Sequence, residues 1–260
     1  MAPNRRFSLA LDSLSELNLQ ATPAPSQPTQ SASALSDVLA KLGPLPREGL
    51  FLGIASDGLP VLLNLYDPHP GPMLILGETR SGKTAFLQSI ARSVVLTHKE
   101  NEVQFGVITK HTEEWKEPPG SPQQVGVFDV TQPSAQDFLL SLASWAHSNK
   151  NSQQSTLLLI DDLEAIARLD FDALQNFRWL LLRGPARRVW PLITMSAERY
   201  GQVLSWIEIF RTRVFGRIED ARLAEALGGD KVSALDQLEA GKQFSLRENG
   251  NWLRFNLPSF

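Results

Sequence analysis

The stretch that most constrains the fold of this chain is MLILGETRSGKTAFLQSIA, from Met73 to Ala91. Its first four residues form an apolar run that predicts a buried strand, and its second half has the pattern of an amphipathic helix. Between them, GETRSGKT has the spacing G-x-x-x-x-G-K-[S/T]. Such a loop surrounds phosphate groups with backbone N–H donors and places them at the positive end of the following helix. The stretch therefore predicts a phosphate-binding loop, the alternative being an ordinary glycine turn.

Two side chains of the loop have predicted roles of their own. Lys83 is expected to reach the β- and γ-phosphates of ATP, and the Thr84 hydroxyl is expected to bind Mg²⁺. Arg80 stands where many such loops have glycine, so its side chain is expected to point outward. The predicted nucleotide-binding residues are Gly77, Glu78, Thr79, Arg80, Ser81, Gly82, Lys83, Thr84 and Ala85.

A second motif, STLLLIDDLEAI (155–166), supplies the acidic groups that such a loop requires. Its apolar residues predict a buried strand that ends at two aspartates. Asp161 is predicted to hold Mg²⁺ through water, and Asp162 to polarise the attacking water. An acidic pair at this place is also a common helix N-cap, which is the alternative. Asp162 is shorter than the glutamate usual in ATPases, so slow hydrolysis, or assistance from Glu164, is also expected.

Strands and helices alternate along most of the chain, which predicts an α/β fold with a mostly parallel sheet covered by helices on both faces. Hairpins are predicted at 49–65, around Ser56-Asp57-Gly58, and at 242–258. The further predicted strands are 103–109, 125–130, 156–160, 190–195 and 214–218, and the further predicted helices are 137–147, 173–182 and 220–227.

The first part of the chain has a different composition. Residues 21–34, ATPAPSQPTQSASA, are rich in proline, serine and alanine and have no periodicity, which is typical of a flexible linker. The apolar residues before it, among them Phe7 and Leu9, belong to a partly ordered tail or to a peptide that docks on a protein partner or a neighbouring subunit. We therefore predict a tail and linker over 1–45 and one P-loop ATPase domain over 46–260.

Composition excludes several classes of protein. The chain has no cysteine, which removes disulfides, thiol catalysis and cysteine-bound zinc. No apolar run approaches the ~18 residues of a membrane span, and no secretion signal is recognisable, so a cytoplasmic protein without membrane insertion is expected. The net charge of −3 argues against a generally basic nucleic-acid coat, although an oligomer can still line a basic channel with few residues per subunit.

The ordered set of motifs from Leu50 to Pro258 resembles the FtsK–HerA superfamily of P-loop motors. Besides the two motifs above, RRVWPLITMSAERY (187–200) resembles the family's sensor strand, and RTRVFGRIEDARLAEALGG (211–229) its next strand, helix and paired glycines. The resemblance implies a RecA-like sheet, ATP hydrolysis and a hexameric ring. It also assigns Ser196 to the sensor position and Arg199 to the arginine that follows, whereas Glu198 replaces the family's glutamine.

The function is narrowed but not fixed by these residues. A ring motor requires an arginine from the adjacent subunit. Arg213 is the predicted residue, with the cluster Arg183, Arg187 and Arg188 as alternatives. Three hypotheses stay open: a motor on double-stranded DNA, an ATPase for secretion or pilus assembly, and a nucleotide-binding regulatory subunit with weak turnover.

Overall fold

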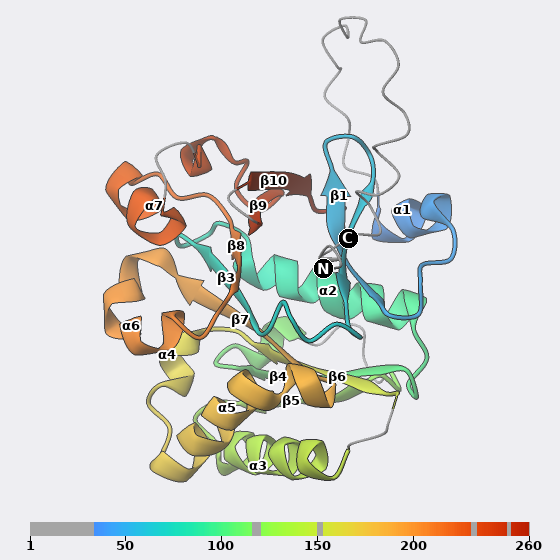
Figure 1. The fold of residues 1–260 in the computed structure, drawn as a ribbon, viewed down its shortest axis with the longest axis vertical. Coiled ribbons are helices and arrows are strands. Elements are labelled where there is room, and N and C mark those ends of the chain that lie inside the picture. The colour runs from blue at the N-terminus through green and yellow to red at the C-terminus, as the bar shows by residue number, and fades with distance from the viewer. Residues whose placement is uncertain (1–33, 116–120, 150–152, 230–232, 249–250, 260) are drawn as a thin grey trace, which may run out of the picture.

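One continuous sheet of ten strands runs through the part of the chain that the computed structural model describes, residues 34–115, 121–149, 153–229, 233–248 and 251–259 (Figure 1). In spatial order its strands are β2 (Pro60–Asn64), β1 (Gly49–Ala55), β10 (Asn251–Asn256), β9 (Gln243–Glu248), β8 (Thr212–Phe215), β3 (Met73–Gly77), β7 (Val189–Ser196), β6 (Ser155–Ile160), β4 (Val103–Thr109) and β5 (Gln124–Asp129).

The six strands from β8 to β5 are parallel, and the four from β9 to β2 are antiparallel. The two predicted hairpins form the antiparallel part at one side, and the phosphate-loop strand β3 lies inside the parallel part. The predicted fold class, a mostly parallel sheet flanked by helices, is confirmed.

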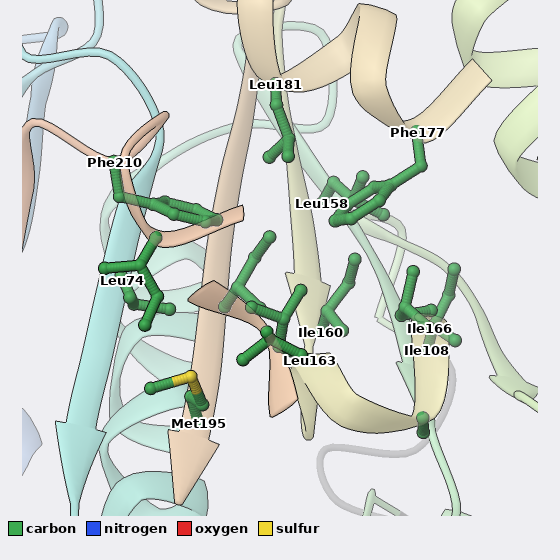
Figure 2. Packing of buried hydrophobic residues seen from close by; sticks show 14 of the residues in the cluster. Leu74, Ile108, Leu158, Ile160, Leu163, Ile166, Phe177, Leu181, Met195 and Phe210 are labelled. Atoms are coloured by element: carbon green, nitrogen blue, oxygen red, sulfur yellow. The ribbon is translucent and has the colours of Figure 1, made fainter. Parts of the chain in front are cut away.

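Both faces of the inner parallel strands β3, β7, β6 and β4 are buried, which explains why these strands are largely continuous apolar runs rather than alternating ones. Successive side chains of a strand point to opposite faces. Leu158 and Ile160 of β6 therefore join one core cluster, and Leu157 and Leu159 join the other. Helix α2 (Lys83–Thr97) covers the second face, whereas α3 (Pro133–Ser148) and α5 (Phe171–Arg183) cover the first. Figure 2 shows Phe177 and Leu181 of α5 beside the strands of this first face.

Several shorter elements complete the fold. They are α1 (Leu35–Leu42), α4 (Leu163–Ile166), α6 (Leu204–Ile207), α7 (Ala221–Gly228) and the single 3-10 turns η1 (Thr112–Trp115), η2 (Pro185–Arg187), η3 (Ala197–Gln202) and η4 (Leu235–Gln237). Among the described residues, none of the helices combines the length and the apolar character that crossing a membrane requires.

The tail and linker predicted over 1–45 need a correction in their last part. Residues 1–33, including the apolar peptide expected to dock on a partner, lie outside the described residues. Residues 35–42, however, form α1, and its Leu35 and Leu39 pack against Phe51 of β1. The two leucines are one helical turn apart, so a single short apolar stripe suffices to dock the helix. The low-complexity sequence immediately before it concealed this element.

Packing between β4 and α3 gives a first testable expectation. A Cβ atom added at Gly106 would overlap the ring of Phe138, and that ring is stacked on Phe128 at a centroid distance of 4.4 Å. Because the ring cannot move freely, Gly106→Ala should lower the free energy of unfolding by about 1–3 kcal/mol. Urea unfolding followed by circular dichroism measures this change. Gly201→Ala is the control, since its Cβ would meet no atom within 4 Å; equal stability of the two variants would contradict the packing argument.

Candidate active site

Three adjacent parallel strands, β3, β7 and β6, end at the same edge of the sheet, and their continuations form the candidate site. Gly77 at the end of β3 is paired with Ser196 at the end of β7, and Ile160 at the end of β6 is paired with Ile193. Side chains that follow the carboxyl ends of neighbouring parallel strands lie close together, which is where α/β sheets generally bind ligands. This strand order places the phosphate loop, the acidic pair Asp161-Asp162 and the sensor segment after β7 close together in space.

The Lys83 side chain folds back along the phosphate loop. Its ammonium donates hydrogen bonds to the backbone oxygens of Gly77, at 3.0 Å, and Glu78, at 2.7 Å. Burial lowers the pKa of Lys83 below its usual value. Four carboxylates oppose that shift, in decreasing order Glu198, Asp161, Asp162 and Glu78. The charges of four acidic side chains thus converge on the Lys83 ammonium.

The backbone of the loop adopts two left-handed conformations. Arg80 has φ +65° and an exposed side chain, so its presence is compatible with the loop, at the cost usual for a non-glycine residue there. Gly82 has φ +93°, and a Cβ at this position would overlap the backbone of Gly241. Gly241 also donates its N–H to the Ser81 oxygen at 3.0 Å. The turn before β9 therefore supports the loop from the side.

The predicted metal ligands Thr84 and Asp161 are in direct contact. The Thr84 hydroxyl donates to Oδ2 of Asp161 at 2.8 Å, and the Thr194 hydroxyl of β7 donates to Oδ1 at 2.8 Å. Oxygen atoms of hydroxyl and carboxylate groups are the ligands that Mg²⁺ prefers. The donor set thus fits Mg²⁺, with Thr194 orienting the carboxylate from the opposite oxygen.

Asp162 is held by contacts at its backbone and at its carboxylate. Its backbone N–H donates to the Thr194 hydroxyl at 2.8 Å, and its Oδ2 lies 3.0 Å from the Lys110 ammonium at the end of β4. Its φ of +98° is rare for a residue with a side chain, and such strain is often found at functional sites. Glu164, by contrast, is 3% exposed, and no described residue offers either of its carboxylate oxygens a hydrogen bond.

The sensor segment reaches the phosphate loop through Glu198 and not directly through Ser196. The Ser196 hydroxyl donates to Oε2 of Glu198, and the backbone N–H of Thr79 donates to Oε1 at 3.1 Å. Burial raises the pKa of Glu198, but hydrogen bonds from Ser196, its own backbone and Thr79, together with the charge of Lys83, outweigh it, so the pKa is lowered. Glu198 is therefore a charged group in contact with the phosphate loop at Thr79.

The structure places Arg213 among contacts within its own chain. Its guanidinium donates to the backbone oxygens of Phe210, at 3.3 Å, Leu227, at 3.4 Å, and Ile207, at 3.3 Å. Burial, and then the charge of Arg247, lower its pKa. The predicted role in the adjacent subunit stays a prediction, and it would require this guanidinium to leave its three acceptors.

The alternative arginines differ in exposure. Arg188 donates to the backbone oxygen of Leu65 and lies over the ring of Tyr66 at 3.7 Å from its centroid. Arg183 and Arg199 are exposed, and Arg187 is half-buried.

Sequence reasoning missed three contributors to this site. Thr194, Lys110 and Gly241 each contact a predicted site residue. The carboxylate of Glu78, which was predicted as part of the loop, accepts from the backbone N–H groups of Glu219 and Asp220 at 2.8 and 3.2 Å. Thr194 had a detectable signal, since it is a polar residue within an apolar strand and shares a face with Ser196. Lys110 and Gly241 had none, because each contact joins distant parts of the sequence.

One part of the chain matches a known protein family. Residues 52–143 match the model of the FtsK/SpoIIIE family. No curated protein matches the chain. The match confirms the resemblance predicted from the sequence motifs over a stretch that includes the phosphate loop.

Solved structures with the same fold have low sequence identity to this chain. ATPases 2 and 3 of EssC from Geobacillus thermodenitrificans give a TM-score of 0.70 at 9% identity, covering 90% of this chain and 48% of that one. ATPases 2 and 3 of Thermomonospora curvata EccC, in complex with a signal sequence peptide, give 0.67 at 15% identity, covering 94% and 45%. The conjugation coupling protein TcpA of pCW3, in monomer form with ATPγS, gives 0.60 at 12% identity, covering 81% and 65%. These likenesses establish the RecA-like P-loop fold, and the chain spans less than half of the EssC and EccC chains.

Proposed function

We propose that this chain is an ATPase domain of the FtsK/SpoIIIE type, and that it binds ATP with Mg²⁺ at residues 77–85 and hydrolyses it. The observation that carries the proposal is the 2.8 Å hydrogen bond between Thr84 and Asp161. It joins the first turn of the helix after the phosphate loop to the end of the acidic strand, the two places that hold Mg²⁺ in P-loop ATPases. An ordinary glycine turn gives no reason for this contact.

Each side chain then has a defined task. The loop N–H groups and Lys83 hold the phosphates, and Thr84 and Asp161 hold the ion, which supplies charge neutralisation at the phosphate oxygens. Asp162, anchored beside Asp161, orients and polarises the attacking water. Ser196 acts on the nucleotide through Glu198. Phosphate release measured with ATP and Mg²⁺ tests the proposal, and no nucleotide binding at micromolar protein would contradict it.

The hydroxyl of Thr194 provides a prediction about the support of the metal ligand. Thr194→Val keeps the shape of the side chain but removes the donor to Asp161 and the acceptor for the Asp162 backbone. Loss of such a supporting contact typically costs about 10–100-fold in metal affinity or activity. We therefore expect the Mg²⁺ concentration for half-maximal hydrolysis to rise by about that factor, whereas ADP affinity without Mg²⁺ changes little. Thr194→Ser should restore the wild-type value; a serine variant as defective as the valine one would contradict the hydroxyl's role.

We further propose that the domain works in a hexameric ring as a motor on a linear polymer, with double-stranded DNA as the first candidate. The FtsK/SpoIIIE match and the conjugation coupling protein TcpA support DNA. The secretion ATPase EccC and its signal-peptide complex support a protein substrate instead. ATP supply also favours a cytoplasmic location.

One measurement separates the two polymers. In dilute salt, double-stranded DNA should stimulate ATP hydrolysis several-fold if DNA is the substrate, and a flat response excludes the DNA motor. Mass measurement with and without ATP tests ring formation.

A regulatory subunit with weak turnover is the second candidate. The observation that favours it is the ion pair between Asp162 and Lys110, which engages the proposed catalytic carboxylate in a strained backbone conformation. Turnover that stays very slow with either polymer, in a protein that binds ATP, would favour this candidate.

A further inference from the structure

The carboxylate of Glu198 occupies a position that a phosphate group would be expected to approach. It accepts a hydrogen bond from the Thr79 backbone N–H, one of the donors of the phosphate loop. Of the four carboxylates whose charges raise the pKa of Lys83, Glu198 raises it most. A single acidic side chain thus interacts with two loop groups that the proposed function assigns to phosphate binding.

The position of Glu198 in the sheet indicates which phosphate of a bound nucleotide it lies near. Glu198 follows β7, and β7 lies between the phosphate-loop strand β3 and the acidic strand β6. A nucleotide's terminal phosphate must lie between the loop and the acidic pair if Asp161 holds its metal and Asp162 its attacking water. Glu198 therefore borders the γ-phosphate end of the site rather than the base or ribose end.

Like charges at close range repel, and the repulsion grows with the charge of the ligand. ADP and ATP share the α- and β-phosphates, whereas only ATP places the additional γ-phosphate charge beside Glu198. From this geometry we propose that Glu198 lowers the affinity of the site for ATP relative to ADP, and that ATP binds fully only when Glu198 leaves the Thr79 N–H. The inference rests on the proposed function, because it concerns the same nucleotide site.

The contacts of Glu198 also explain how its carboxylate can bond to the Thr79 N–H again after ATP has left the site. The Ser196 hydroxyl holds Oε2, so one oxygen stays anchored in the sensor segment while the other bonds to the loop. Glu198 also lies at the start of η3, followed directly by the exposed Arg199. Displacement of Glu198 by the γ-phosphate would thus shift a residue whose direct neighbour in the chain is an exposed arginine. Such a shift links occupancy of the γ-phosphate position to the outer surface of the domain.

Glu198→Gln tests the charge separately from the shape. The glutamine oxygen can still accept from Thr79, so the variant keeps the hydrogen bond and loses only the negative charge. Calorimetric titration of the full chain with ADP and with ATPγS, both with Mg²⁺, measures two dissociation constants for each protein. In the variant, we expect ATPγS to bind on the order of tenfold tighter than to the wild type, and ADP less than about twofold tighter. Glu208→Gln, at an exposed position after α6, is the matched control and should change neither constant.

The outcomes distinguish this inference from the proposed function. If the wild type binds both ligands and Glu198→Gln leaves their affinity ratio unchanged, Glu198 does not select between them and the inference is wrong. If the wild type binds neither ligand, the proposed nucleotide site itself is wrong. A selective gain for ATPγS in Glu198→Gln but not in Glu208→Gln supports both.

Discussion

Lys83→Ala should weaken binding of ATP with Mg²⁺ by about 100-fold or more, the loss expected for charge-assisted hydrogen bonds to two phosphates. The ammonium is already part of the loop, where it bonds to the oxygens of Gly77 and Glu78. Its removal leaves four carboxylates around the site with no lysine at their centre, so the added phosphates meet uncompensated negative charge. Hydrolysis should fall below detection, and titration with ATPγS measures the loss of binding directly.

Two comparisons make the Lys83 result decisive. Lys41→Ala changes an exposed lysine on α1 and should bind ATPγS as the wild type does. Thermal unfolding of Lys83→Ala should show that the domain is folded, because the lost side-chain bonds go to two carbonyl oxygens of a partly exposed loop. A folded Lys83→Ala protein with unchanged nucleotide affinity would remove the basis for the phosphate-loop assignment.

Asp162→Asn should lower the rate of ATP hydrolysis by about 10²–10⁴-fold, the usual contribution of a positioned acid or base. Nucleotide affinity should stay within about twofold, because the Thr84–Asp161 contact is untouched. Asparagine tolerates left-handed backbone conformations well, so the φ of +98° is expected to persist. Single-turnover hydrolysis with enzyme in excess measures the chemical step apart from product release.

The control for Asp162→Asn is Asp172→Asn, which changes an exposed residue in the first turn of α5. It should hydrolyse ATP at the wild-type rate. Equal hydrolysis by Asp162→Asn and the wild type would show that Asp162 is not the catalytic group. Glu164 would then need a new argument as well, since it is buried away from solvent.

Local sequence patterns predicted the parts of this structure that depend on neighbouring residues. The phosphate loop, the acidic strand and both hairpins each lie within one short stretch, and the structure places all of these elements where the sequence indicated. The strand bounds differ by a few residues at most; β8, for example, ends at Phe215 rather than at Ile218. Continuous apolar runs were informative because both faces of the inner parallel strands are buried.

The contacts between elements could not be predicted in the same way. Thr194 meets Asp161 because β7 lies beside β6, and Glu198 meets Thr79 because β7 also lies beside β3. That order is a property of the whole sheet and is not encoded in any one motif. The change from glutamine to glutamate was visible in the sequence, but its contact with the loop N–H was not.

The support that Gly241 gives to Ser81 and Gly82 also bears on how the protein becomes functional during synthesis. The ribosome synthesises β3, the phosphate loop and α2 early. It synthesises the turn that supports the loop much later, just before β9. A nascent chain that stops short of that turn has the whole nucleotide motif but lacks the Gly241 N–H that fixes it. The phosphate loop should therefore reach its final conformation only after this turn has been synthesised.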